Sequence, residues 1–137
     1  MTAVIAVDTS VAVPLVVSNH RSHLGVVRWW NGRPVALSGH ALVETYSVLT
    51  RLPGDARLTA ADAATLLAER FESPLLLAAN DAARLPELLA AKGVAGGAVY
   101  DAIIAMAALG NGNVLATRDA RAAGTYQLIG ATIEVVG

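Results

Sequence analysis

The sequence predicts an α/β fold, a three-layer α/β/α sandwich around a mostly parallel central sheet. Short apolar runs alternate with segments of helical periodicity along all 137 residues, and such alternation is typical of β-α-β units. The central apolar runs also lack polar alternation, which indicates strands buried on both faces, as in a parallel sheet. A chain of this length suits a single domain, which we expect to span residues 1–137.

The predicted elements follow from this alternation. Strands are expected at residues 4–7, 34–38, 74–78, 114–117 and 132–136. Helices are expected at residues 11–18, 22–31, 39–51, 59–71, 81–92 and 98–110, with a last short helix after Asp119. Thr59 followed by Asp62 is typical of a capped helix start, and Gly110-Asn-Gly112 of a helix end.

Composition narrows the class of protein. Hydrophobic residues make up 55% of the chain and charged residues 15%, which excludes a disordered chain and indicates much buried surface. No apolar stretch reaches the roughly 18 residues of a membrane span, and the N-terminus lacks the basic region of a signal peptide. Without cysteine there is no disulfide or thiolate chemistry. We therefore expect a cytoplasmic protein without membrane contact, whose net charge of -1 permits a nucleic-acid partner but does not require one.

Two isolated acids stand out in the apolar segments. Asp101 is the only charged residue between Lys92 and Arg118, and Asp8 the only charged side chain between Met1 and His20. An ionised carboxylate in such surroundings costs several kcal/mol unless something pairs with it. A bound divalent cation would provide that partner, because hard metals prefer carboxylate oxygens.

The predicted topology brings four acids to the same edge of the sheet. Asp8 directly follows the first predicted strand, and Asp119 lies two residues beyond the strand at 114–117. Asp101 lies in the first turn or so of its helix, and Glu44 in the first two turns of the helix after the second strand. Ligands of open α/β sheets bind beyond the carboxyl ends of the strands. We therefore expect these four side chains at one edge of the sheet.

Four carboxylates in one cleft repel each other, so some would hold protons at neutral pH unless a cation neutralised them. Mg²⁺ or Mn²⁺ held there would lower the pKa of a bound water and align it with a phosphodiester. A zinc site is not indicated, because the three histidines lack HExxH spacing and there is no cysteine.

Each acid also has a purely structural explanation. Asp8 and Asp119 can cap the helices that follow them, and Asp101 can be stabilised by the helix dipole. Glu44 can belong to a solvated polar stripe on its helix. Capping and catalysis are compatible, so both interpretations stay open. Trp29 and Trp30 are interpreted as core or dimer contacts rather than a base-stacking platform.

Four segments in this order and spacing resemble the PIN domain, and more specifically the VapC-type toxins of bacterial type II toxin–antitoxin pairs. They are Asp8-Thr-Ser-Val-Ala-Val-Pro14, Ala41-Leu-Val-Glu-Thr-Tyr-Ser-Val-Leu-Thr-Arg51, Tyr100-Asp-Ala-Ile-Ile-Ala105 and Leu115-Ala-Thr-Arg-Asp-Ala-Arg121. The similarity runs over essentially the whole chain. Each motif alone is weak, and the combination is specific.

The resemblance implies a Mg²⁺- or Mn²⁺-dependent endoribonuclease with a flavodoxin-like sheet. It assigns the metal ligands to Asp8, Glu44, Asp101 and Asp119, and gives the hydroxyls of Ser10 and Thr117 a role in arranging waters or phosphate. It further implies a homodimer that cleaves RNA and is inhibited by a cognate VapB-type antitoxin, whose tail occupies the acidic groove, often with an Arg. The chain departs from the family in one place, because no aromatic residue follows Asp119 before Tyr126.

Two other functions compete with this interpretation. A phosphatase of the haloacid dehalogenase type would use Asp8 as nucleophile, but it needs a second acid where this chain has Ser10. A catalytically silent PIN-like interaction module would keep the fold and lose the chemistry. If the ribonuclease interpretation holds, Asp8→Asn or Asp101→Asn should abolish cleavage and preserve the fold.

Overall fold

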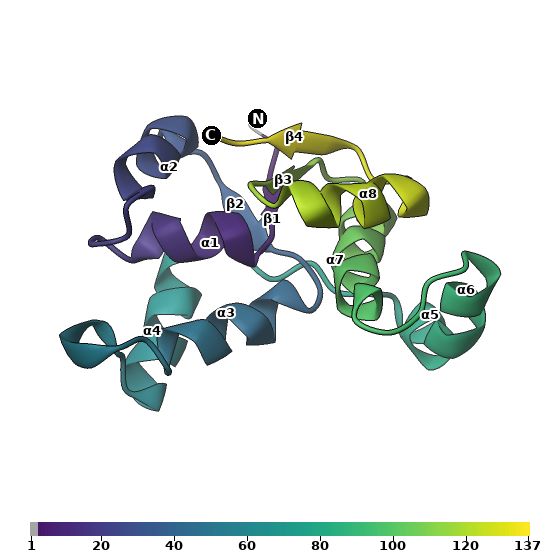
Figure 1. Cartoon of the computed structure of the whole chain (residues 1–137), viewed down its shortest axis with the longest axis horizontal. Helices are drawn as coiled ribbons and strands as arrows, with labels where there is room; N and C mark the ends of the chain where they lie inside the picture. Colours follow the sequence, from purple (N-terminus) through teal and green to yellow (C-terminus); the bar gives the residue numbers. More distant parts are fainter. Residues whose placement is uncertain (1–2) are drawn as a thin grey trace.

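A computed structural model describes residues 3–137, in which four parallel strands form one sheet flanked by helices (Figure 1). The strands are β1 (Ile5–Val7), β2 (Val35–Leu37), β3 (Leu115–Thr117) and β4 (Ile133–Val135), in the order β2-β1-β3-β4. In Figure 1 the sheet lies between α1 (Thr9–Val16) and α2 (His23–Trp30) on the left and α7 (Ala98–Gly110) and α8 (Ala120–Ile129) on the right. The predicted α/β architecture with a parallel sheet is confirmed.

The remaining helices lie between β2 and α7 in the sequence. They are α3 (Ala41–Leu49), a 3-10 turn η1 (Gly54–Ala56), α4 (Ala60–Arg70), α5 (Ala79–Ala83) and α6 (Leu85–Ala91). The predicted capped start of α4 is confirmed, because Thr59 Oγ1 accepts a 3.1 Å hydrogen bond from the backbone N–H of Asp62. No helix within residues 3–137 is long and apolar enough to cross a membrane.

The core lies on both faces of the two central strands. Ala6, Val7, Leu115 and Ala116 are all fully buried, which explains why their sequences lack the alternation of a half-exposed strand. β4 is an edge strand, and its Val135 is largely exposed. The central strands therefore carry their polar residues only where they end, and those ends form the site described below.

The strand predicted at residues 74–78 does not form. Leu75 alone makes an isolated bridge, with Ser38. Its N–H donates to the carbonyl of Leu37 at 2.9 Å, and its own carbonyl accepts from the N–H of Gly39 at 2.8 Å. Just before this segment, the N–H of Glu72 donates to the carbonyl of Val35 at 2.9 Å, so separate hydrogen bonds rather than a continuous ladder hold this part of the chain to β2. This segment therefore runs beside β2 without extending the sheet.

The single helix predicted at residues 81–92 is two helices, α5 and α6, separated at Arg84. The break is explained by Pro86, which lies in the first turn of α6. A proline inside a continuous helix removes a backbone hydrogen bond, and its ring clashes with the carbonyl four residues earlier, here that of Ala82. At the start of a helix neither penalty applies.

Candidate active site

Asp8 is buried at the carboxyl end of β1 and accepts four hydrogen bonds. Its Oδ1 accepts from Ser10 Oγ at 2.6 Å and from the N–H of Val11 at 3.3 Å. Its Oδ2 accepts from Thr117 Oγ1 at 2.5 Å and from the hydroxyl of Tyr126 at 2.8 Å. Hydrogen bonds to the charged form of a carboxylate offset the cost of burying it. Both carboxylate oxygens of Asp8 are therefore satisfied although the residue is only 3% exposed.

The hydroxyls of Ser10 and Thr117 connect the ends of the two central strands. Thr117 Oγ1 donates to Asp8 and accepts from the N–H of Asp119 at 3.0 Å. Ser10 Oγ donates to Asp8 and accepts from the N–H of Arg118 at 2.8 Å. Because parallel strands end at the same edge of the sheet, Asp8 and Asp119, which are 111 positions apart in the sequence, are linked through the side chain of Thr117.

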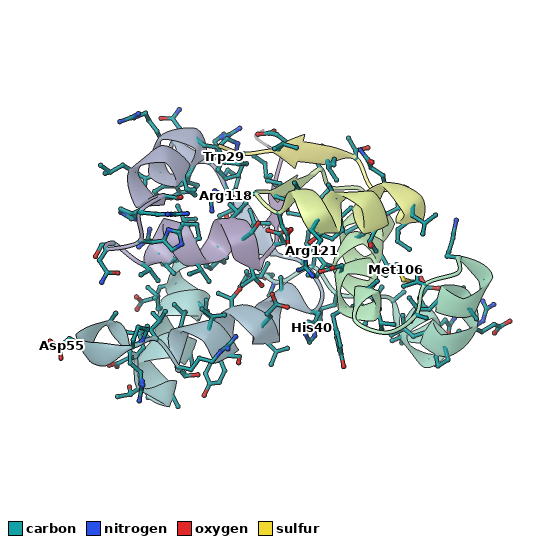
Figure 2. The ribbon with its side chains drawn as sticks, viewed as in Figure 1. Trp29, His40, Asp55, Met106, Arg118 and Arg121 are labelled. Carbon is teal, nitrogen blue, oxygen red and sulfur yellow. The ribbon has the colours of Figure 1, made fainter. Side chains whose placement is uncertain are left out.

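Three of the predicted acids line one cleft of about 380 Å³: Glu44 from α3, Asp101 from α7 and Asp119 at the start of α8. His40, Tyr100 and Arg121 are among the other lining residues. Figure 2 shows His40 and Arg121 in the central region where α3, α7 and α8 meet. Asp8 is buried and does not line this cleft. It is joined to the cleft through Thr117, which it shares with Asp119.

The cleft carries negative charge that the protein does not fully neutralise. Burial raises the pKa of Asp101 above its ordinary value; Arg121 partly opposes this, and the carboxylates of Asp119, Glu44 and Asp8 raise the pKa further. In residues 3–137 no three His, Asp or Glu side chains form a ready-made metal centre. The donors nevertheless fit a hard divalent cation, because they are carboxylates whose mutual repulsion such an ion would relieve.

The four acids differ in how far the fold itself uses them. Asp8 caps α1, and Asp119 caps α8 by accepting from the N–H groups of Arg121 at 3.0 Å and Ala122 at 3.2 Å. The capping explanation is therefore correct for both. Among the described residues, by contrast, the carboxylates of Asp101 and Glu44 accept no hydrogen bond, although His40 Nε2 lies 3.8 Å from Glu44 Oε2.

Ser38 and Gly39 fix the position of α3 against α7. Gly39 has a φ of 53°, and a Cβ there would lie 2.7 Å from the carbonyl oxygen of Ile103 in α7. The buried Ser38 Oγ donates to the carbonyl of Ile104 at 2.8 Å. This close approach sets the helix that carries Glu44 beside the helix that carries Asp101. In the sequence, only the Ser-Gly pair that ends the second strand hints at it.

Tyr126 is the site residue that sequence reasoning missed. It lies on the buried face of α8 with Ala122 and Ile129, and its hydroxyl reaches Asp8. Burial raises the pKa of Tyr126, and the charge of Asp8 and its hydrogen bond raise it further, so the phenol remains protonated and remains a donor. The helical spacing of Ala122, Tyr126 and Ile129 could have shown that Tyr126 faces inward, but not which group it meets.

The two tryptophans lie outside the cleft, and the interpretation of both as packing residues is confirmed. Trp29 and Trp30 pack against the core. The indole N–H of Trp29 donates to the carboxylate of Glu134, and the guanidinium of Arg33 lies 4.9 Å from the Trp29 ring centroid. The guanidinium of Arg70 lies 5.6 Å from that of Trp30. Neither ring is left free to stack on a base at the cleft.

Comparisons with known proteins bear on this site. Ribonuclease VapC27 of Mycobacterium tuberculosis is 57% identical over 131 residues, with 96% of each chain covered. Ribonuclease VapC40 of the same species is 43% identical over 133 residues, covering 96% of this chain and 98% of that protein.

Solved structures share the fold. VapBC2 of Rickettsia felis, bound to a promoter DNA fragment, matches with a TM-score of 0.66 and 16% identity over 98% of this chain and 100% of that one. The sarcin-ricin loop cleaving toxin VapC20 of Mycobacterium tuberculosis matches with a TM-score of 0.66 and 23% identity, over 89% of this chain and 94% of that one. A family model described as the PIN domain matches residues 5–127. The chain therefore belongs to the PIN-domain family.

Proposed function

We propose that this protein is a Mg²⁺- or Mn²⁺-dependent endoribonuclease that acts as the toxin of a toxin–antitoxin pair. The observation that carries the proposal is the acidic cleft lined by Glu44, Asp101 and Asp119, in which burial raises the pKa of Asp101 and the neighbouring carboxylates raise it further. A divalent cation bound there would relieve the mutual repulsion of these carboxylates. The relatives at 57% and 43% identity are named ribonucleases, which supports hydrolysis of RNA as the reaction.

In this mechanism Glu44, Asp101 and Asp119 would hold the metal in the cleft, and the buried Asp8 would add its charge to the acidic set. When bound, the ion would lower the pKa of a water and stabilise charge on the phosphodiester oxygens. Thr117 and Ser10 hold Asp8 in one orientation. Arg121, whose side chain is 85% exposed and lies 3.5 Å from Asp119, is free to turn toward a substrate phosphate, because exposed ion pairs are weak.

The same geometry disfavours the phosphatase alternative. A nucleophilic aspartate needs a free lone pair directed at the phosphorus, but both carboxylate oxygens of Asp8 already accept two hydrogen bonds each. Its burial also keeps it away from the cleft. A role in orienting and charging the site fits Asp8 better than direct attack.

The proposed inhibitor is a VapB-type antitoxin that places an Arg in the acidic cleft. The excess of carboxylates over the single Arg121 favours a guanidinium ligand there, because guanidinium and carboxylate form paired hydrogen bonds. VapBC2 of Rickettsia felis, whose fold this chain shares, belongs to such a pair. We also propose that the active toxin is a homodimer.

Calorimetric Mn²⁺ titration, paired with cleavage of total RNA, tests the proposal. Wild type should bind Mn²⁺ and cut RNA, and Asp101→Asn should lose both. Asp55→Asn is the matched control: Asp55 lies in η1, far from His40 and Arg121 in Figure 2, and this variant should behave as wild type.

Asp101→Asn protein that cut RNA at the normal rate would contradict the assignment. Folded wild-type protein that neither bound Mn²⁺ nor cut RNA would favour a silent interaction module, in which Asp8 and Asp119 serve only as helix caps.

A further inference from the structure

We propose that the rings of Tyr100 and His40 form a stacking platform for an unpaired nucleobase at the rim of the acidic cleft. The platform would hold a base next to the phosphodiester that is cut. This inference rests on the proposed function, because it assumes that the cleft binds the phosphate of a single-stranded RNA.

The two rings come from different elements and meet at the cleft. Tyr100 lies in the first turn of α7, directly before Asp101, and His40 immediately precedes α3. Their ring centroids are 4.6 Å apart and their planes are inclined by 34°. Both residues line the cleft that contains Glu44, Asp101 and Asp119. A base stacked on this pair would therefore lie beside the proposed metal ligands.

Tyr100 is exposed in a way that its packing does not explain. It is a large aromatic residue with 53% of its surface accessible, whereas Tyr126 is almost fully buried. The His40 ring packs against the Tyr100 ring, and Oε2 of Glu44 lies 3.8 Å from Nε2 of His40. A ring held in place in this way loses little conformational entropy when a ligand binds, so less of the stacking energy is offset by ordering the side chain.

A nucleobase is the ligand that fits both the ring and its neighbours. The cleft offers carboxylates for a metal-bridged phosphate, and the exposed Arg121 offers a positive charge. The base attached to that phosphate needs a flat apolar surface, and the ring of Tyr100 provides one at the cleft. Stacking tolerates any base, because every base has a π-face. Unpaired RNA is also the form in which proteins reach bases by stacking.

The test separates binding of bases from binding of phosphates. Fluorescence anisotropy is measured with a labelled oligouridylate of about ten nucleotides, within the usual range of single-strand site sizes, and with an abasic oligoribonucleotide of equal length. Both probes carry the same number of phosphates. All proteins keep the acids of the cleft, are checked for folding by circular dichroism, and are measured with Ca²⁺ in place of Mn²⁺, because Ca²⁺ also binds carboxylate oxygens. Gel electrophoresis after each measurement confirms that the probes are uncut.

The parent protein with the wild-type cleft should bind the oligouridylate more tightly than the abasic probe. Adding Tyr100→Ala should weaken oligouridylate binding about 5- to 150-fold, the range for loss of one base–aromatic stack, and leave abasic binding unchanged. Tyr100→Phe should preserve the preference. Tyr46→Ala, which removes a ring from a separate groove between α3 and α4, should preserve it too.

A parent without preference for the base-containing probe would overturn the platform, and so would a preference that survives Tyr100→Ala. Cleavage of total RNA by the wild-type protein is scored separately. If that protein cuts RNA and the base preference is absent, the platform fails alone. If it cuts no RNA, the proposed function fails, whatever the anisotropy shows.

Discussion

The hydroxyl of Tyr126 donates a 2.8 Å hydrogen bond to Oδ2 of Asp8, a residue 118 positions earlier in the chain. The bond joins α8 to the end of β1 and is one of the four that hold the buried carboxylate. It also gives a function to the aromatic residue whose position departs from the family pattern.

Tyr126→Phe removes one donor to Asp8 and keeps the ring in the core. Because buried hydrogen bonds to charged groups contribute about 1.5–3 kcal/mol, we expect the free energy of unfolding to fall by about that amount. Cleavage should fall on the order of 10- to 100-fold, the range for residues in the outer shell of a metal site. Urea denaturation and RNA cleavage measure the two effects. Tyr46→Phe should change neither, and a Tyr126→Phe protein equal to wild type in both would show that the bond is incidental.

Asp8→Asn should keep its fold, as the sequence predicts, but should be less stable than the wild-type protein. The amide nitrogen would replace one oxygen and face two of the four donors, which we expect to cost about 1–3 kcal/mol of unfolding free energy. Asp119→Asn is the matched control, because aspartate and asparagine are equally good N-caps. Chemical denaturation of both variants decides the point. Equal stability of Asp8→Asn and wild type would mean that the four hydrogen bonds rearrange without cost.

Asp101→Asn should stabilise the metal-free protein at neutral pH. The folded state raises the pKa of Asp101 above its ordinary value of 3.8, so the folded protein binds this proton more tightly than the unfolded chain does. The contribution of Asp101 to the free energy of unfolding therefore falls as the pH rises from its pKa in the unfolded chain to its higher pKa in the folded protein. Thermal unfolding with EDTA should show the variant above wild type near pH 7 and equal to it below about pH 4. A wild-type protein that was the more stable at neutral pH would refute this account of the cleft.

Gly39→Ala should weaken the junction between α3 and α7. Alanine is strained at a φ of 53°, and its Cβ would lie 2.7 Å from the carbonyl oxygen of Ile103. We expect a loss of about 1–3 kcal/mol and a fall in cleavage, because Glu44 and Asp101 would shift relative to each other. Gly124→Ala, in α8 with nothing within 4 Å of the added Cβ, should instead stabilise the protein by about 0.5–1 kcal/mol. Normal cleavage by Gly39→Ala would show that the spacing of the two helices is not critical.

Local patterns in the sequence were sufficient for the sheet and for the general position of the acids. The fully apolar runs around Val7 and Ala116 predict buried parallel strands, and parallel strands bring Asp8 and Asp119 to one edge. Local patterns failed where an element depends on what its backbone meets. Residues 74–78 have the composition of a strand, yet only Leu75 makes a bridge, with Ser38 just beyond the end of β2.

The site shows the same division. The isolation of Asp101 in an apolar helix is visible in the sequence, because the cost of burying a charge depends on the surrounding composition. The contacts of Tyr126 with Asp8 and of Gly39 with Ile103 join segments that are distant in the chain. No local pattern encodes their partners, so only the folded arrangement reveals them.

Asp8 and Asp119 serve the fold as well as the proposed chemistry, and this affects how the activity of a related chain can be inferred from its sequence. A descendant that gave up catalysis would still need both residues, because one satisfies four buried donors and the other caps α8. Selection for folding alone would retain them. Asp101 and Glu44 accept no such hydrogen bonds among the described residues, so a chain relieved of its chemistry would lose these two first. In a homologue of uncertain activity, Asp101 and Glu44 are therefore the informative positions.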